Sequence, residues 1–135
     1  MLDAMRVYVC RHAKAADGEP DELRELTPRG IEQARVLGAR LAELTEPPTL
    51  VLTSPLVRAR QTAAEIAHET GAAVRVEPRL APGASVDDLR SAVDGLPGPV
   101  ATVGHQPDCS EIALALTGAD PGFAPATMAC LEVSA

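Results

Sequence analysis

Short apolar runs alternate with amphipathic stretches along the whole chain. The apolar runs predict strands at residues 5–10, 50–53, 73–77, 100–103 and 128–133. Apolar residues at helical spacing predict helices at about 28–44, 54–69, 86–93 and 108–116. Strands and helices that alternate in this way are typical of an α/β fold with a mostly parallel sheet. We therefore expect a single domain over residues 1–135, with a three-layer α/β/α architecture.

Capping residues mark the ends of the two longest predicted helices. Thr27 is a good N-cap residue, and Pro28 suits the first helical position. Ser54 and Pro55 repeat this pattern before the second helix, and Gly71 fits its end. Polar, glycine-rich or proline-rich stretches predict loops at 15–25, 80–83 and 95–99.

Composition and charge exclude several classes of partner. Hydrophobic residues make up 46% of the 135 residues but aromatic residues only 1%, so the core must be built from small aliphatic side chains. The net charge of −7 and the near-absence of aromatic rings argue against a nucleic-acid partner. No apolar run is long enough to span a membrane, and the first residues do not resemble a secretory signal. We expect a cytoplasmic protein without a membrane partner, whose three cysteines are buried thiols.

Several cationic or imidazole side chains follow predicted strands. Arg11 and His12 come directly after the first strand, Arg58 lies about one turn after the second, and His105 follows the fourth. The carboxyl ends of strands in an open α/β sheet form one ligand-binding edge, so these side chains should meet there. Arg24, in the first long loop, can reach the same rim. Three arginines at one place need an anion among them, which predicts a phosphate pocket.

Three sequence blocks occur in an order known from one protein family. They are Arg11-His12-Ala13-Lys14 with Arg24-Glu25-Leu26-Thr27 and Gly30, then the run from Ser54 to Ala63, and then Val103-Gly104-His105-Gln106-Pro107. Together they resemble the histidine phosphatase superfamily, whose fold is that of phosphoglycerate mutase. The short chain and the Arg-His-Ala-Lys form are most similar to the SixA-type phosphohistidine phosphatases.

This resemblance implies a role for each matching residue. His12 would be the nucleophile, a neutral imidazole that forms a phosphohistidine enzyme intermediate which water then cleaves. Arg11 and Arg58 would hold the phosphoryl oxygens, and His105, protonated when phosphate is bound, would donate to them. The remaining residues expected to bind substrate are Arg24, Gln106 and Lys14. The resemblance implies no metal and no cofactor.

An acid expected in part of this family is absent from its usual positions. Members that act on phosphomonoesters carry a Glu after the third strand, where this chain has Leu80-Ala81-Pro82-Gly83, or an Asp after the second histidine, where it has Gln106. General acid catalysis is worth about 10²–10⁴-fold, so its loss favours substrates with a better leaving group, such as phosphohistidine. Other carboxyls that could replace it are Asp87, Asp88 and Asp108, although carboxylates in first helical turns usually serve as caps.

Three functions remain open from the sequence. The first is a phosphatase that removes phosphate from phosphohistidine on a partner protein and releases inorganic phosphate. The second is a small-molecule phosphatase or mutase of the same superfamily. The third is a module that binds phosphate without turnover. An exposed sheet edge could also pair with a second copy, which leaves a homodimer open.

Overall fold

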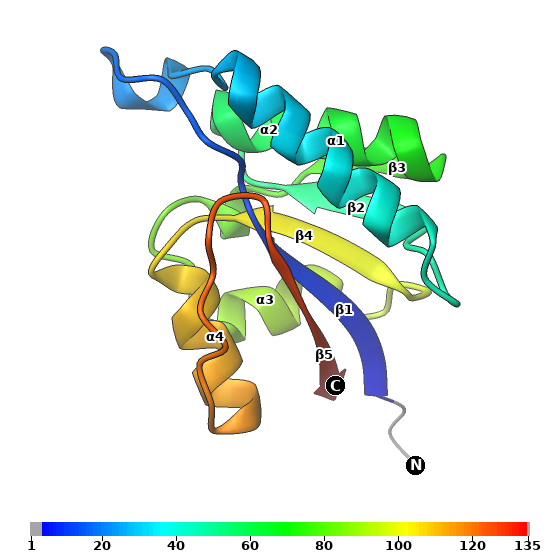
Figure 1. The fold of residues 1–135 in the computed structure, drawn as a ribbon. Coiled ribbons are helices and arrows are strands. Elements are labelled where there is room, and N and C mark those ends of the chain that lie inside the picture. Colours follow the sequence, from blue (N-terminus) through cyan, green and yellow to red (C-terminus); the bar gives the residue numbers. More distant parts are fainter. Residues whose placement is uncertain (1–3, 135) are drawn as a thin grey trace.

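The computed structural model describes residues 4–134, whose strands form one mixed sheet (Figure 1). The strand order is β3-β2-β4-β1-β5. β1 pairs in parallel with β4, β4 with β2, and β2 with β3, whereas β5 runs antiparallel to β1. The strands are β1 (Ala4–Arg11), β2 (Leu50–Thr53), β3 (Ala73–Val76), β4 (Val100–Gly104) and β5 (Met128–Ser134). The edge strand β3 is exposed along its whole length.

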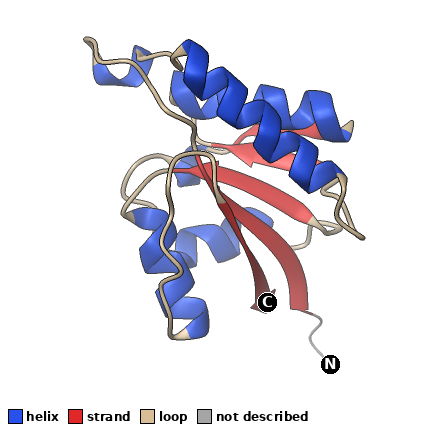
Figure 2. Ribbon diagram, in the orientation of Figure 1, coloured by secondary structure: helices blue, strands red, loops and turns tan. Residues whose placement is uncertain are grey.

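Helices cover both faces of this sheet (Figures 1 and 2). One face carries α1 (Pro28–Ala42) and α2 (Val57–Thr70), and the other carries α3 (Val86–Val93) and α4 (Asp108–Thr117). Two short 3₁₀ turns, η1 (Asp21–Leu23) and η2 (Pro78–Leu80), lie in the connections. The predicted three-layer α/β/α architecture is confirmed.

Alternate residues of β1 supply the cores on the two sides of the sheet. Val7 and Val9 pack with residues of α3 and α4, whereas Tyr8 and Cys10 pack with residues of α1 and α2. This alternation follows from the two-residue period of a strand. Small side chains fill the second core, which contains Leu37, Leu41, Val51, Ala59, Ala63, Ile66, Ala101 and Val103.

The local signals for α1 and for the end of α2 are confirmed. The Thr27 hydroxyl accepts the backbone N–H of Gly30 at 2.9 Å, and Pro28 is the first helical residue. Gly71 ends α2 with a left-handed backbone, φ 77°. The predicted start of α2 is wrong, because the helix begins at Val57 rather than at Ser54.

Ser54 is not the N-cap because its side chain is used elsewhere. Its hydroxyl oxygen accepts the N–H of Leu56 at 3.2 Å and lies 2.7 Å from Nε2 of His105. A tertiary contact therefore replaces the local cap that the sequence suggested.

Two further expectations concern cysteines and membranes. Cys10 and Cys109 are buried free thiols as expected, but Cys130 is exposed on β5, so the expectation of burial was wrong there. Within residues 4–134, every helix is too short or too polar to cross a bilayer.

Candidate active site

The sheet order brings three strand ends together at one edge. Arg11 is in register with Gly104 of the neighbouring β4, and the N–H of His12 donates to the Gly104 carbonyl at 3.0 Å. On the other side of β4, the N–H of Ser54 donates to the Val103 carbonyl at 3.0 Å. The residues after β1, β2 and β4 are thus neighbours, as the sequence analysis predicted for parallel strands.

His12 is held in one ring orientation by a backbone carbonyl. Its Nδ1 lies 2.6 Å from the carbonyl oxygen of Ala13, and since a carbonyl only accepts, Nδ1 carries the hydrogen. The N–H of Ala13 donates in turn to the Thr62 hydroxyl at 3.0 Å. In the neutral ring Nε2 then keeps a free lone pair, which is what attack on phosphorus requires.

Burial and nearby positive charge keep the His12 ring neutral. Burial, together with the charges of Arg58, Arg11 and Arg24, lowers its pKa from 6.5 to about 4, against the opposing effect of the Ala13 hydrogen bond. At neutral pH the imidazole is therefore unprotonated. All three predicted arginines lie near enough to this ring for their charges to lower its pKa.

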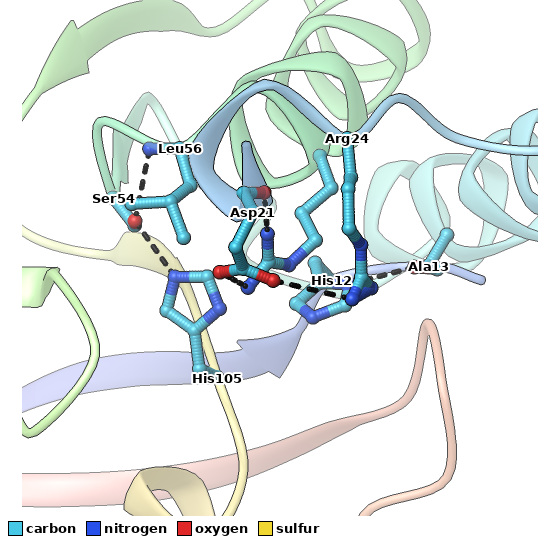
Figure 3. A network of polar contacts seen from close by, with 8 residues as sticks. His12, Ala13, Asp21, Arg24, Ser54, Leu56 and His105 are labelled. Carbon is cyan, nitrogen blue, oxygen red and sulfur yellow. Dashed lines mark hydrogen bonds and ion pairs between the residues drawn. The ribbon is translucent and has the colours of Figure 1, made fainter. Parts of the chain in front are cut away.

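His105 lies beside His12 and is buried (Figure 3). Its Nε2 is 2.7 Å from the Ser54 hydroxyl, whereas its Nδ1 is buried without a hydrogen-bond partner among the described residues. Burial lowers its pKa to about 4, helped by the nearby His12 ring and the charge of Arg58. The free protein therefore holds a neutral His105, and the protonation expected with phosphate bound stays a prediction for that other state.

Two of the arginines bind the same carboxylate. Arg58 is only 7% exposed, and its two Nη atoms donate to the backbone carbonyl of Asp21 at 2.9 Å and to Oδ2 of Asp21 at 3.2 Å. Arg24 donates from Nη1 to the other carboxylate oxygen, Oδ1, at 3.2 Å. Figure 3 shows the Asp21 carboxylate beside the two imidazole rings. An anion thus lies between Arg24 and Arg58, and it belongs to the protein itself, so the phosphate pocket among three arginines stays a prediction.

Arg11 is the last residue of β1, and its charge lowers the pKa of His12. Its Nη1 donates to the carbonyl of Phe123 at 2.9 Å. The Nε atoms of Arg11, Arg24 and Arg58 are all buried without a hydrogen-bond partner among residues 4–134. Buried guanidinium hydrogens of this kind are donors available to an incoming anion.

The other two predicted substrate-binding residues are Lys14 and Gln106. Lys14 is exposed, and its backbone N–H donates to the side chain of Gln33 at 3.0 Å. The Gln106 amide is bonded on both sides to Ser110, donating to its hydroxyl at 2.8 Å and accepting its N–H at 3.0 Å. Gln106 therefore caps the first turn of α4. Binding of substrate by Lys14 or Gln106 stays a prediction.

The three carboxyls considered as replacement acids all have structural contacts. Asp87 is exposed and pairs with Arg90 at 3.4 Å. Asp88 forms a capping box with Ser85. Asp108 is buried, and its Oδ2 accepts the N–H groups of Gly83 and Ala84 at 2.9 and 3.1 Å.

Sequence reasoning missed Asp21 and Ser54. Asp21 lies in the acidic first loop, three residues before Arg24, and that spacing was the available signal. Ser54 directly follows β2, as His12 directly follows β1. The pair Ser54-Pro55, however, suggested only a helix cap. Over residues 4–134, no three His, Cys, Asp or Glu side chains gather as metal ligands would. The positive charge around His12 is supplied by guanidinium groups.

The family model that matches this chain is the histidine phosphatase superfamily (branch 1), over residues 7–82. The match includes Arg11, His12, Arg24 and Arg58, and it ends before His105. The chain belongs to the histidine phosphatase superfamily. A similar protein of this kind is Rv1276c of Mycobacterium tuberculosis (strain ATCC 25618 / H37Rv), whose function is uncharacterised. It is 37% identical over 111 residues, which cover 78% of this chain and 68% of that protein.

Solved structures of superfamily members confirm the fold. The provisionally named phosphohistidine phosphatase SixA from Agrobacterium tumefaciens matches with a TM-score of 0.82 and 28% identity, over 94% of this chain and 90% of that one. The protein histidine phosphatase SixA complexed with tungstate matches with a TM-score of 0.79 and 24% identity, over 96% of this chain and 97% of that one. The phosphoglycerate mutase-like, SixA-like fold predicted from the sequence is therefore confirmed.

Proposed function

We propose that this histidine phosphatase superfamily member removes the phosphoryl group from phosphohistidine on a partner protein, without a metal, through a phosphohistidine formed on His12. The proposal rests on the hydrogen bonding, the pKa and the surroundings of the His12 ring. Its Nδ1 is bonded to the Ala13 carbonyl, its pKa is lowered to about 4, and Arg11, Arg24 and Arg58 surround it. A neutral nucleophile with a free Nε2 is thus set among three donors for phosphoryl oxygens.

The chemistry runs in two displacements at phosphorus. In the first, Nε2 of His12 attacks, the P–N bond of the substrate breaks, and its electron pair goes to the leaving imidazole, which takes a proton from solvent. In the second, water attacks the phosphorus on His12, loses a proton to solvent, and releases inorganic phosphate and the neutral His12 ring. Arg11 and Arg58 hold the phosphoryl oxygens, and Nδ1 of His105 adds a donor as charge builds up.

The surroundings of the pocket favour phosphohistidine over a sugar phosphate. An alkoxide leaving group needs a proton from a nearby acid, whereas imidazole leaves phosphorus far more easily. Asp88 and Asp108 accept hydrogen bonds from a helix cap and from backbone N–H groups, and Asp87 forms an exposed ion pair with Arg90, which supports the lack of a general acid at these positions. The similarity to the A. tumefaciens SixA, at 28% identity, supports the same substrate class.

The test compares three substrates with the wild-type protein and His12→Ala. We expect phosphate release from a phosphohistidine-bearing protein, weaker release from an aryl phosphate, and little from a sugar phosphate. His12→Ala should lose turnover, and the wild type should yield an acid-labile phosphoenzyme that this variant does not form. The reverse ranking of substrates would favour the small-molecule phosphatase or mutase. Phosphate binding without turnover of any substrate would favour the non-catalytic module.

A further inference from the structure

The Asp21 carboxylate occupies the arginines that a phosphoryl group would use. Its Oδ2 accepts from Arg58 and its Oδ1 from Arg24, each at 3.2 Å. The backbone carbonyl of the same residue accepts a further hydrogen bond from Arg58 at 2.9 Å. A phosphoryl group offers three oxygens to guanidinium groups in the same way as a carboxylate offers two. Asp21 and a substrate thus present the same chemistry to the same donors.

Charge balance explains why the free protein holds a carboxylate here. Arg58 is buried, and a buried guanidinium without an anion is strongly destabilising. With His12 and His105 neutral, the cluster keeps three positive charges from its arginines. Asp21 is the carboxylate that forms ion pairs with two of them. It reduces the excess positive charge of the cluster from three to two whenever no phosphate is bound.

We propose, building on the function above, that Asp21 is an internal competitor of the phosphoryl group, which pairs with Arg24 and Arg58 until a bound phosphoryl group displaces it. The dianion and the Asp21 carboxylate repel each other and compete for the same Nη atoms, so binding one weakens binding of the other. The competition lowers the affinity of every phosphoryl ligand by the same factor.

An equal penalty on all ligands still determines which of them occupy the site. Inorganic phosphate and small phosphate esters have few contacts beyond the arginines, so the penalty leaves them mostly unbound. A phosphoprotein gains further binding energy from contacts outside the pocket, so it still saturates the site. The same penalty speeds the release of the phosphate product. Because of Asp21, only ligands with enough additional binding energy occupy the site, and this favours macromolecular substrates.

The test measures the dissociation constant of inorganic phosphate, and of tungstate as a second probe, by calorimetry. Asp21→Asn keeps the shape and one acceptor oxygen of the side chain but removes its charge. Asp21→Ala removes the charge and both acceptor oxygens. Asp17→Asn is the matched control, since Asp17 is an exposed residue of the same loop and its loss changes the net charge equally. We expect Asp21→Asn and Asp21→Ala to bind phosphate about five- to tenfold tighter, and Asp17→Asn to stay within about twofold of wild type.

Thermal unfolding supplies a second readout on the same variants. Without phosphate, Asp21→Asn should unfold at a lower temperature than the wild type, because Arg58 loses its counter-ion. At saturating phosphate the difference should close, since the ligand then supplies the anion and a tighter ligand stabilises more. Unchanged or weaker phosphate binding in Asp21→Asn would overturn the proposal and assign Asp21 to orienting the arginines.

The outcomes separate this proposal from the proposed function. If the wild type binds phosphate but releases none from phosphohistidine, the substrate assignment fails, while tighter binding by Asp21→Asn still supports the internal competitor. If the wild type turns over phosphohistidine and Asp21→Asn binds phosphate no tighter, only the competitor fails. If neither wild type nor variant binds phosphate or tungstate, and the wild type releases no phosphate from phosphohistidine, both are wrong.

Discussion

The imidazole rings of His12 and His105 lie 5.2 Å apart, centroid to centroid, with their planes tilted by 59°. Burial first, and then the nearby guanidinium charges, lower the pKa of both rings, and the His12 ring also lowers the pKa of His105. The two rings therefore act as a neutral pair in the free protein. His12 has a free Nε2, and His105 has a free Nδ1. A phosphoryl group bound between them would meet a nucleophile on one side and a donor on the other.

The first prediction is that Ser54 orients His105. The Ser54 hydroxyl oxygen already accepts the N–H of Leu56, so its hydrogen can donate to Nε2 of His105, which leaves the hydrogen of that ring on Nδ1. Ser54→Ala should lower kcat by about tenfold, the effect of one buried hydrogen bond, and should shift the ring nitrogen NMR signals of His105. Ser110→Ala, which removes a serine hydroxyl bonded to Gln106, should change neither. An unchanged His105 spectrum in Ser54→Ala would show that the serine only packs.

The second prediction concerns Arg58, the most buried of the three arginines. Arg58→Ala should lower kcat by about 10²–10³-fold, because a donor to the transition-state oxygens is removed. Arg58→Lys should restore little of this, since a lysine offers no planar pair of N–H donors. Arg60→Ala on the exposed side of the same helix is the control and should stay near wild type. Full activity in Arg58→Ala would mean that Arg58 serves Asp21 and not the substrate.

The sequence predicted the parts of the site that follow from strand topology. Arg11, His12 and His105 come directly after apolar runs, and apolar runs are the strongest local signal for strands. Once the strands are parallel and adjacent, residues after their carboxyl ends must be neighbours. The sequence did not predict the strand order, and the structure supplies it by making β1, β4 and β2 neighbours.

Asp21 and Ser54 could not be assigned in the same way. Residues 15–25 have no apolar periodicity, so nothing local indicates that η1 folds back to place Asp21 on Arg58. Ser54 satisfies the local rule for an N-cap, yet its hydroxyl bonds to His105, which is 51 residues away in the sequence. In both cases a long-range contact decides the position of the side chain, and local sequence patterns do not contain it.

The third prediction links helix packing to the nucleophile. A Cβ on Gly30 would lie 2.0 Å from the carbonyl oxygen of Lys14, so Gly30→Ala must displace the backbone that follows Ala13. Because the Ala13 carbonyl fixes His12, this variant should lose about 1–3 kcal/mol of unfolding free energy and much of its kcat. Gly38 lies further along α1, away from His12. In Gly38→Ala the atom closest to the new Cβ is Cγ of the flexible Glu69 side chain on α2, at 3.0 Å. That variant should lose some stability and keep its kcat.

Chemical denaturation and steady-state kinetics on both variants check this prediction. A Gly30→Ala protein with wild-type kcat would show that the carbonyl of Ala13 tolerates the displacement. It would also remove the claimed link between the start of α1 and the ring of His12.

The fourth prediction concerns stability below neutral pH. His12 and His105 each have a pKa of about 4 in the folded protein, against 6.5 for an unperturbed histidine. Between these values the unfolded chain binds up to two more protons than the folded one, so stability is greatest above about pH 6.5 and falls as the pH is lowered. Each ring contributes at most about 1.4 kcal/mol per pH unit, and His12, which is only partly buried, contributes less.

Urea unfolding at pH 7 and pH 5 isolates this contribution when the wild type is compared with the double variant His12→Asn, His105→Asn. Carboxylates titrate alike in both proteins, so their effect cancels in the difference. We expect the wild type to lose about 2–4 kcal/mol more than the double variant over this interval. Equal losses would mean that the two rings are protonated in the folded state near pH 6, and the neutral nucleophile at His12 would then lose its support.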